Sequence, residues 1–580
     1  MFKRTMTAFG FALACSTPAH TPTAAQPIAW HRFTPAAFEE ARRENKLVMV
    51  DAGIEGCTAC RWMHEGAYRD GSVIKRIHDG FVAVSVDADQ EPDLGDRFLP
   101  WGWPATIFFT PDGRQVYALQ GSESGADFAK LLDDLVLQKK NGTLGTHVSE
   151  SGRGESNTNL AAACIDTKKR LAEMSDAWGW GGTERVALFG AFEQGVIRAR
   201  SRGESDIAAK VDAMAEGEAK LLDPKQGGIY VGSWGKDWDN AIPEKRTIFE
   251  AAALDAFALE LHRTGDAKWK TRADLVRKYL EEQMLSPRGT FYSTQQDIGP
   301  IDHGVYTDQN AMAIEAYVRF FEATGDASAL SIATRAADEI SKTRSRPDGG
   351  VDQGEESAEL GTDRRLRPTK PNSRLYLKAQ GEMGLALLTL HEATGEDRWL
   401  DAARKIAKAI ATLEDSKTGG FAGTTARDTD ALVGQRKPFM DNVAAARFLM
   451  RLGALQRDDA MRATVDRTLA YLGPQVRFES AWGTGALALA FEERLLGPVE
   501  ITIVRGGDDA LAKKMRDEMA RVYEPRKIVR LEAAGHYPKP KTGAAIYVCT
   551  PVACSSPAAT VEAARQNVER MTLAQNAACQ

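Results

Sequence analysis

The sequence predicts an α/β domain at the N-terminus, an all-α ring of helical hairpins in the middle and a small α/β segment at the end. Three observations predict this fold class. A strand-like apolar run leads into the motif Cys57-Thr58-Ala59-Cys60, and a helix-like segment follows it. Glycines recur about every sixty residues between long amphipathic segments of 158–497. Alternating apolar residues, typical of strands, return after residue 498.

Composition limits the function classes. The 580 residues suffice for about two to four domains of roughly 150 residues each. Hydrophobic residues make up 43% and charged residues 27%, so each domain can bury a core. The net charge of −6 argues against a dedicated nucleic-acid binder, which would carry a basic excess. The 7 cysteines are too few for a disulfide scaffold, so their positions decide their meaning.

Residues 1–25 are predicted to be a secretory signal peptide. Lys3 and Arg4 precede a short apolar run, and the small residues 23–25 offer a cleavage site. Cys15 offers the alternative of lipid attachment, and a cytosolic N-terminus is the remaining alternative. No later run reaches the roughly 18 apolar residues of a membrane span. We therefore expect a periplasmic or otherwise exported protein, soluble or lipid-anchored, whose thiols meet an oxidising compartment.

Residues 26–140 are expected to form a thioredoxin-like domain. Apolar runs at 47–52, 81–87 and 106–109 have the length and composition of buried strands, and 127–137 has the pattern of a helix. The resulting order is strand, Cys-x-x-Cys, helix, strand, X-Pro, strand, helix. This is the order of the thioredoxin fold.

The cysteine spacing suits thiol–disulfide exchange. Cys57 is expected where the strand turns into the helix, and the free N–H groups and helix dipole there stabilise a thiolate. Cys60 lies one turn on, close enough to resolve a mixed disulfide, while Glu55 would oppose thiolate formation. Two alternatives stay open, half of a zinc site with His64 or a structural disulfide. Since no second Cys-x-x-Cys completes a four-ligand site, neither a metal nor a cofactor is predicted.

This module resembles thioredoxin, and the resemblance implies roles for two further residues. Asp51, on the strand before Cys57, matches the buried carboxylate that takes the proton of the resolving thiol. Pro104 matches the cis-proline whose neighbouring backbone pairs with the substrate strand. Two positions depart from thioredoxin: Gly56 stands where a Trp is usual, and Ala83 lies near the place of the Lys that partners the buried Asp.

Residues 158–497 follow a Gly- and Ser-rich linker at 141–157 and are expected to hold about twelve helices. Thr-Gly-Asp or Thr-Gly-Glu turns at 264–266, 324–326 and 394–396 separate the two helices of a pair, and a long Gly-rich loop ends each pair. Six such hairpins close naturally as an (α/α)6 toroid with alternate helices inside. An open solenoid is the alternative.

In such a toroid the long loops gather at one mouth, over the N-termini of the inner helices. Aromatic, acidic and amide side chains there suit a sugar, and paired carboxylates suit glycoside chemistry. The structural alternative is that acids at helix N-termini complement the dipole. The candidate residues of this toroid site are Glu244, Lys245, His303, Asp308, Asn310, Asp441 and Asn442.

Eight segments in fixed order carry a wider resemblance: Cys57–Cys60, Val86–Asp93, Gly102–Pro104, Pro243–Lys245, Gly289–Ser293, Asp308–Ala311, Asp441–Asn442 and Tyr547–Cys549. Taken together, the chain resembles the family that includes spermatogenesis-associated thioredoxin-like protein. This resemblance implies a thioredoxin module followed by a six-hairpin toroid. The family commonly has His and Trp between its cysteines, where this chain has Thr58 and Ala59.

Residues 498–580 are expected to form a small C-terminal α/β appendage. It would hold strands at 499–504, 527–531 and 544–549 and a helix at 510–522. Cys549 and Cys554 form a Cys-x4-Cys pair, which indicates a structural disulfide or, alternatively, a second redox pair that exchanges with Cys57.

The sequence thus predicts an exported thiol–disulfide oxidoreductase module fused to a toroid that selects a client or binds a glycan. Its partners would be a thiol- or disulfide-bearing protein and a carbohydrate, with no nucleic acid. One alternative is a carbohydrate-active toroid, glycosidase or lyase, with a structural thioredoxin arm and Glu244, Asp308 and Asp441 as its acids. The other alternative is a binding protein without turnover.

Overall fold

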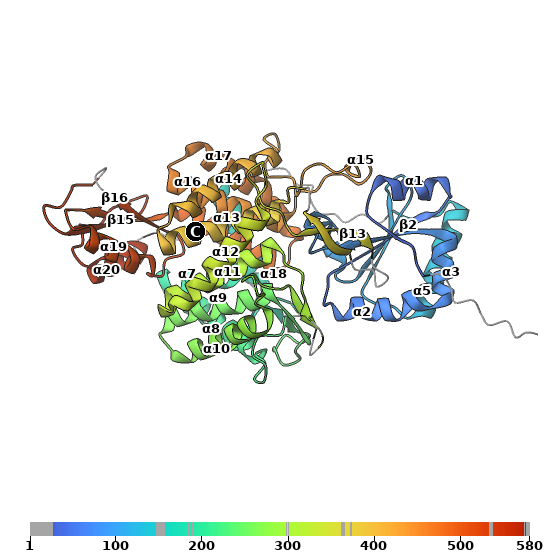
Figure 1. The fold of residues 1–580 in the computed structure, drawn as a ribbon, viewed down its shortest axis with the longest axis horizontal. Coiled ribbons are helices and arrows are strands. Elements are labelled where there is room, and N and C mark those ends of the chain that lie inside the picture. The colour runs from blue at the N-terminus through green and yellow to red at the C-terminus, as the bar shows by residue number, and fades with distance from the viewer. Residues whose placement is uncertain are drawn as a thin grey trace, which may run out of the picture.

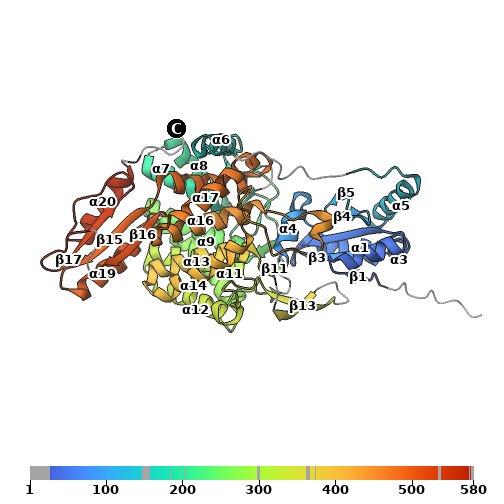
Figure 2. The same ribbon diagram turned by 90° about the horizontal axis from the view of Figure 1, so that it is seen from above.

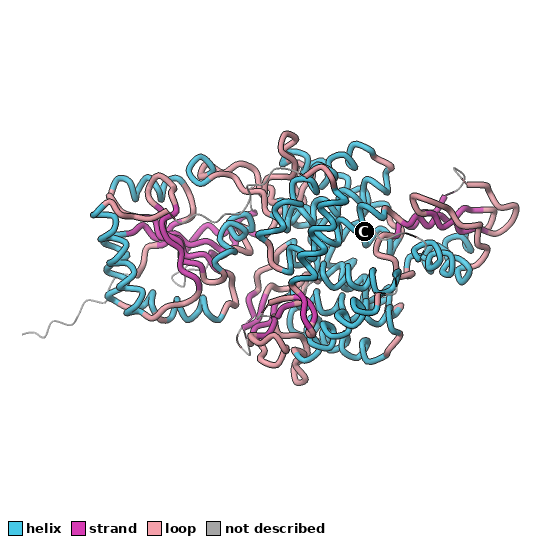
Figure 3. The backbone as a smooth tube through the Cα atoms, turned by 180° about the vertical axis from the view of Figure 1, so that it is seen from behind, coloured by secondary structure: helices cyan, strands magenta, loops and turns pink. Residues whose placement is uncertain are grey.

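The computed structural model describes residues 27–146, 157–182, 185–187, 189–202, 204–296, 299, 301–360, 366–371, 374–532, 537–573 and 575. The predicted signal peptide and Cys15 lie outside these residues. Three parts follow one another along the long axis of the molecule (Figure 1), with the helical ring between two sheets (Figure 3). The predicted fold class is confirmed: a thioredoxin-like α/β domain, an (α/α)6 toroid and a small α/β appendage.

The N-terminal part is a five-stranded sheet in the order β1-β3-β2-β4-β5, with helices on both faces. Its central strand β2 is buried along its whole length, which explains the unbroken apolar run in the sequence. Strand β3 runs parallel to β2, and β4 runs antiparallel to it. Its elements are β1 Trp30–His31, α1 Pro35–Arg43, β2 Leu47–Gly53, α2 Thr58–Glu65, α3 Gly71–Gly80, β3 Phe81–Asp87, α4 Pro92–Phe98, β4 Ala105–Phe109, β5 Gln115–Gln120 and α5 Gly125–Asn141.

Twelve helices in the described part of the chain form the toroid. Each inner helix packs on the next, and α18 packs back on α7, so the ring closes and the solenoid alternative is wrong. The inner helices are α7 Phe189–Arg202, α9 Thr247–Thr264, α11 Thr307–Thr324, α13 Leu377–Thr394, α16 Phe439–Gln456 and α18 Ala481–Leu496. The outer helices are α6 Leu160–Glu173, α8 Ser205–Lys220, α10 Ala267–Tyr279, α12 Ala327–Arg344, α14 Asp397–Ile410 and α17 Asp459–Leu472.

The turns between paired helices have the geometry that their sequence predicts. Gly265, Gly325 and Gly395 end inner helices with φ of 68°, 76° and 72°. This left-handed conformation is open to glycine at no steric cost, which is why glycine recurs there. Asp266 and Asp326 follow as N-caps, and each accepts a hydrogen bond from the backbone of the next helix.

The long loops of the ring carry short strands and one short helix. Three of these strands, β10 Glu244–Arg246, β11 Thr294–Gln296 and β12 Ile301–Asp302, form a small sheet on the side of the thioredoxin-like part. The other loop elements are β6 Ser175–Asp176, β7 Gly179–Trp180, β8 Arg185–Val186, β9 Gly232–Ser233, β13 Glu355–Leu360, β14 Leu366–Pro371 and α15 Asp430–Val433.

The C-terminal part covers the end of the ring opposite the thioredoxin-like part (Figure 2). Its sheet has the order β16-β15-β17 and comprises β15 Val499–Arg505, α19 Asp509–Ala520, β16 Lys527–Glu532, β17 Ala544–Cys549 and α20 Val561–Leu573. Arg516 donates to the carbonyls of His391 and Ala393 at the end of α13, and Lys527 lies 2.7 Å from Glu322 of α11. Arg516 thus satisfies carbonyls at the C-terminus of α13, and Lys527 pairs with a buried carboxylate of α11. Within the described segments, no helix has the length and apolar character needed to cross a membrane.

Candidate redox site and toroid mouth

The Cys57–Cys60 pair lies at the N-terminus of α2, as the sequence predicts. The two residues are disulfide-bonded, with 5.2 Å between their Cα atoms. Cys57 is the N-cap of the helix, and its Sγ accepts a hydrogen bond from the backbone N–H of Cys60 at 3.1 Å. The exposed fractions are 8% for Cys57 and 4% for Cys60. A thiolate at Cys57 would therefore receive an N–H donor and the positive end of a helix dipole.

Asp51 is fully buried in β2, on the strand that leads to the motif. The hydroxyl of Tyr68 donates to its Oδ1 at 3.0 Å, and Nε2 of His64 lies 3.5 Å from its Oδ2. Burial raises the pKa of Tyr68, so this phenol stays a hydrogen-bond donor. His64 therefore stands beside the buried carboxylate, for which the sequence analysis found no cationic partner. In the sequence, this contact is indicated by the position of His64 four residues after Cys60, which puts both side chains on the same face of the helix.

The Trp103–Pro104 peptide bond is cis, as the resemblance to thioredoxin predicts. Pro104 is buried directly before β4, and its carbonyl accepts a hydrogen bond from Gly121. Two large apolar side chains are exposed on the segments that carry the motif and the cis-proline. Trp62 of α2 is 59% exposed and Leu99 is 54% exposed.

A loop of the toroid reaches the redox motif. Oε1 of Glu244, at the start of β10, accepts a hydrogen bond from the backbone N–H of Thr58 at 2.6 Å. A Cβ atom at Gly56 would come within 2.5 Å of Oγ1 of Thr294 in β11. The close approach of this loop explains why glycine stands where thioredoxin has a bulky Trp. Glu244, predicted for the toroid site, thus contacts the redox helix.

The segment from the end of β3 into the first turn of α4 docks on the mouth of the toroid. Nη2 of Arg246 lies 2.9 and 2.8 Å from the two carboxylate oxygens of Asp89. Arg427 binds Asp93 through two nitrogens, with Nε and Nη2 each 2.7 Å from one carboxylate oxygen. The side-chain amide of Gln353 donates to the carbonyl of Asp89. All five residues are buried, so the acidic segment covers the mouth instead of leaving it open.

Two of the predicted toroid acids lie around one lysine under this segment. Asp308 accepts a hydrogen bond from Gln353 at 2.7 Å, and its Oδ2 lies 2.8 Å from Nζ of Lys378. Burial raises the pKa of Asp441 well above its usual value, Lys378 opposes this rise, and the nearby Asp96 of α4 adds to it. His303 does not join them in the described contacts, since its ring packs on Tyr292 with 4.4 Å between centroids.

The predicted amides Asn310 and Asn442 hold the backbone of the ring. Asn310 accepts from the N–H of Phe291 and donates to the carbonyls of Phe291 and Tyr306, and Asn442 makes the same three contacts with Phe421 and Pro438. Lys245 is also buried, 2.8 Å from Asp223. Gln380 makes an equivalent clamp with Val351 and Tyr376, and Glu250 accepts the N–H of Ile229; the sequence analysis missed both residues.

Further acids on the inner helices carry no motif and were not predicted. Glu315 of α11 and Glu382 of α13 are each intermediate in exposure. Burial raises the pKa of each to about 7. The positive charge of Lys378 opposes this rise in the pKa of Glu382 and the charge of Asp308 adds to it, so Glu382 belongs to the group around Asp308. In the sequence, both acids could have been identified as charged residues within helices that are otherwise apolar.

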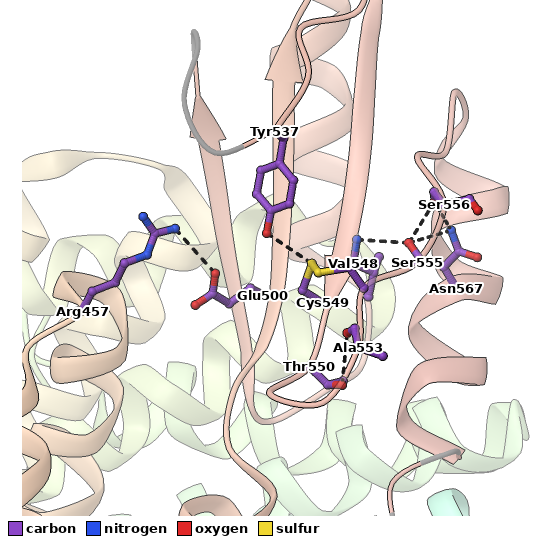
Figure 4. The surroundings of a disulfide bond; sticks show 11 residues. Arg457, Glu500, Tyr537, Val548, Cys549, Thr550, Ala553, Ser555, Ser556 and Asn567 are labelled. Carbon is purple, nitrogen blue, oxygen red and sulfur yellow. Dashed lines mark hydrogen bonds and ion pairs between the residues drawn. A yellow bond between two sulfur atoms is a disulfide. The ribbon is translucent and has the colours of Figure 1, made fainter.

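Cys549 and Cys554 form a disulfide at the end of β17 (Figure 4). This pair lies in the C-terminal part, and the Cys57–Cys60 pair lies in the part at the other end of the ring (Figure 2). The toroid lies between the two pairs, so the alternative of an exchange between them stays a prediction and is not favoured within a single chain.

Residues 16–135 match the family model Thioredox_DsbH, described as protein of unknown function, DUF255. Human spermatogenesis-associated protein 20 is 28% identical over 316 residues, which are 48% of this chain and 40% of that protein. A protein disulfide isomerase-like 2-2 of rice is 26% identical over 132 residues, 22% of this chain and 35% of that protein. The chain thus spans less than half of the length of these two relatives.

Among solved structures, a sugar epimerase from a ruminal bacterium is similar with a TM-score of 0.47 and 12% identity, over 57% of this chain and 97% of the epimerase.

The predicted resemblance to the family that includes spermatogenesis-associated protein is confirmed by the sequence comparisons.

Proposed function

We propose that this protein is an exported thiol–disulfide oxidoreductase whose toroid selects the client. The observation that carries the proposal is the position of Cys57, which caps α2 and accepts a hydrogen bond from the N–H of Cys60. The buried Asp51 on the preceding strand and the cis-Pro104 support it. The proposed catalytic set is Cys57, Cys60, Asp51 and Pro104.

In the proposed cycle, the reduced protein attacks a disulfide of the client. The Cys57 thiolate bonds to one client sulfur, and the other client sulfur leaves as a thiolate. Asp51 takes the proton of the Cys60 thiol, and the Cys60 thiolate then attacks Sγ of Cys57. The client sulfur that was bonded to Cys57 then leaves as a thiolate, so two electrons pass to the client and the Cys57–Cys60 disulfide forms. An external dithiol reduces this disulfide again, and the same steps in reverse oxidise a client dithiol.

The contacts of the toroid loops around the motif support client selection by the toroid. A client strand beside Pro104 would meet Trp62 and Leu99, both exposed. On the other side of the motif it would meet the loop of Glu244 and Thr294, which already contacts residues 56–58. Access to Cys57 is thereby restricted by two separate parts of the chain.

Turnover of a small fluorescent disulfide with dithiothreitol as reductant tests the activity. We expect Cys57→Ser to abolish turnover and Cys60→Ser to accumulate a mixed disulfide at Cys57. The matched control is a Cys549→Ser/Cys554→Ser parent, in which the second described disulfide cannot exchange; it should keep its turnover, and Cys57→Ser made in this parent should lose it. Wild-type turnover in Cys57→Ser would refute the proposal.

A carbohydrate-active toroid is the second candidate. It is favoured by Glu315 and Glu382, whose pKa values near 7 suit general acids, and by Asp308 and Asp441 close to Lys378. Calorimetric titration with oligosaccharides tests it. Binding that is lost in Asp308→Ala and kept in Cys57→Ser would favour this candidate, whereas no binding would remove it. Binding without bond cleavage would identify a binding protein without turnover.

Export is part of the proposal and has its own test. Cell fractionation of the wild type and of Cys15→Ser should place both outside the cytosol. A shift from the membrane to the soluble fraction in Cys15→Ser would identify lipid attachment. Retention of the uncleaved chain in the cytosol would refute export.

A further inference from the structure

We infer that the Cys549–Cys554 disulfide is a second thiol-exchange site, which accepts electrons from an external dithiol through attack at Cys554. This inference does not rest on the Cys57–Cys60 pair, which lies in the part at the other end of the ring. It rests on the unequal surroundings of the two sulfur-bearing residues and on the backbone that holds their hairpin.

The two cysteines differ in access. Cys549 is the last residue of β17 and is buried, with an exposed fraction of 6%. Cys554 is exposed, and the neighbouring Val552 at the tip of the turn is 79% exposed. An attacking thiolate must approach one sulfur while the other leaves, and access is a main determinant of the rate. The geometry therefore makes Cys554 the attacked residue and Cys549 the leaving group.

The leaving sulfur has a donor beside it. The hydroxyl of Tyr537 lies 3.2 Å from Sγ of Cys549 (Figure 4). A disulfide sulfur carries no hydrogen, so the tyrosine donates. The ring of Tyr537 stacks on Tyr547 with 4.5 Å between centroids, which fixes its position. Burial and the nearby Glu500 carboxylate raise the pKa of Tyr537, so it remains a neutral donor.

The local charges are balanced around this donor. Glu500 pairs with Cys549 across the strands, and a lone carboxylate there would oppose a thiolate. Arg457 from the toroid lies 3.7 Å from Glu500 and offsets that charge (Figure 4). The Tyr537 hydroxyl can therefore stabilise the negative charge that develops on Cys549.

The hairpin does not depend on the disulfide. The N–H of Thr550 donates to the carbonyl of Ala553 at 2.9 Å, and the N–H of Ser555 donates to the carbonyl of Val548 at 2.8 Å. The side chain of Asn567 in α20 further ties the returning segment by donating to Ser555. These bonds remain when the S–S bond breaks, so the two thiols stay close enough to re-form it.

The proposed reaction balances. A thiolate of the dithiol bonds to Sγ of Cys554, the Cys549–Cys554 bond breaks, and Cys549 leaves as a thiolate that is protonated from solvent. The second thiol of the donor then attacks the donor sulfur of this mixed disulfide and releases Cys554. Two electrons and two protons pass to the pair, and the donor becomes a disulfide.

The test uses the full chain with Cys57→Ser/Cys60→Ser, so that the first pair cannot exchange, and the labelled peptide identifies the site that reacts. Reduced glutathione is added under native conditions, free thiols are alkylated, and peptide mass spectrometry locates the glutathione. We expect glutathione on Cys554 in about tenfold excess over Cys549, since one hydrogen bond distinguishes the leaving groups. Equal labelling of the two cysteines, or labelling only after denaturation, would overturn the inference.

A matched pair of variants tests the donor. Tyr537→Phe keeps the stacked ring and removes the hydroxyl, and it should slow reduction by dithiothreitol about tenfold. Tyr547→Phe removes the neighbouring hydroxyl, which donates to Pro538 and not to sulfur, and should leave the rate unchanged. Equal rates in the wild type and Tyr537→Phe would contradict the role of Tyr537. The labelling experiment needs no change at Tyr537, so it decides the inference even where Tyr537→Phe fails to fold.

Discussion

Replacing Glu244 with Gln is expected to increase the thiolate fraction of reduced Cys57. In the native protein the Glu244 carboxylate accepts the N–H of Thr58, which directly follows Cys57 in the chain. The carboxylate and a Cys57 thiolate therefore compete for the same positive end of α2. Glutamine keeps an oxygen that can accept the N–H, so the substitution removes the charge with little change in shape.

The size of the effect follows from the separation of the two charges. The Cys57 sulfur and the Glu244 carboxylate lie on either side of the peptide group that joins Cys57 to Thr58, and standard backbone dimensions put them on the order of 6 Å apart. Glu244 is intermediate in exposure, and an effective dielectric constant of about 40 gives a repulsion of about 1.4 kcal/mol. This corresponds to an increase of about tenfold in the thiolate fraction at a pH where the thiol is mostly protonated.

The assay is the rate of iodoacetamide alkylation of Cys57 in the reduced protein, measured from pH 4 to 9 by peptide mass spectrometry. The control is Glu65→Gln, an exposed residue at the C-terminal end of the same helix, where the dipole is reversed. We expect the pH profile of Glu244→Gln to move to lower pH and that of Glu65→Gln to stay close to wild type.

An unchanged or slower alkylation profile in Glu244→Gln would refute the reasoning. It would mean that the loop of Glu244 withdraws from α2 when the disulfide is reduced. Hydrogen exchange at the Thr58 amide in the reduced protein would then show rapid exchange already in the wild type.

Three further predictions concern stability. Asn310→Ala should lower the free energy of unfolding by about 3 kcal/mol, because three backbone hydrogen bonds are lost in a buried site; chemical denaturation measures this, and a loss below 1 kcal/mol would contradict the clamp. Arg427→Leu should leave Asp93 buried without its bidentate partner, costing about 3–5 kcal/mol of docking; faster hydrogen exchange in α4 would report it, and unchanged protection would contradict it. Burial and the nearby Asp255 raise the pKa of Glu218 to about 8. The folded state keeps this proton where the unfolded state has released it, so stability should fall from about pH 5 to pH 8. Glu218→Gln should flatten that slope in denaturation at both pH values, and an unchanged slope would assign it to other groups.

The fold could be predicted because its signals are local. The glycine turns at 265, 325 and 395 recur at similar intervals. The left-handed φ at each turn depends on the glycine itself and not on distant parts of the chain. The strand before Cys57 is buried on both faces, so its apolar run is continuous and easy to identify. Closure of the ring was expected from the number of hairpins alone, and the packing of α18 on α7 bears this out.

The site was only partly predictable, because its partners come from distant segments. Glu244 was assigned to a sugar site, yet it contacts Thr58 across 186 residues of chain. No periodicity encodes how a toroid loop lies against another part of the fold. Asn310 was assigned to the same site because an amide at a helix N-terminus looks the same in sequence whether it binds a ligand or a loop. Helical spacing could have placed His64 on the same face of α2 as Cys60, but the sequence analysis considered it only as a zinc ligand.

The docking of α4 on the toroid mouth makes glycan binding at the mouth incompatible with the observed position of the thioredoxin-like part. A glycan that entered through this mouth would have to separate Asp89 from Arg246 and Asp93 from Arg427, two buried ion pairs. Each separation leaves buried charges without partners and costs about 3–5 kcal/mol, which exceeds what a few sugar hydroxyls return. Glycan binding at the mouth therefore requires the thioredoxin-like part to move away, and the contact of Glu244 with Thr58 would break with it. A sugar ligand would thus act on the redox helix, whereas without one the toroid holds the redox module in place.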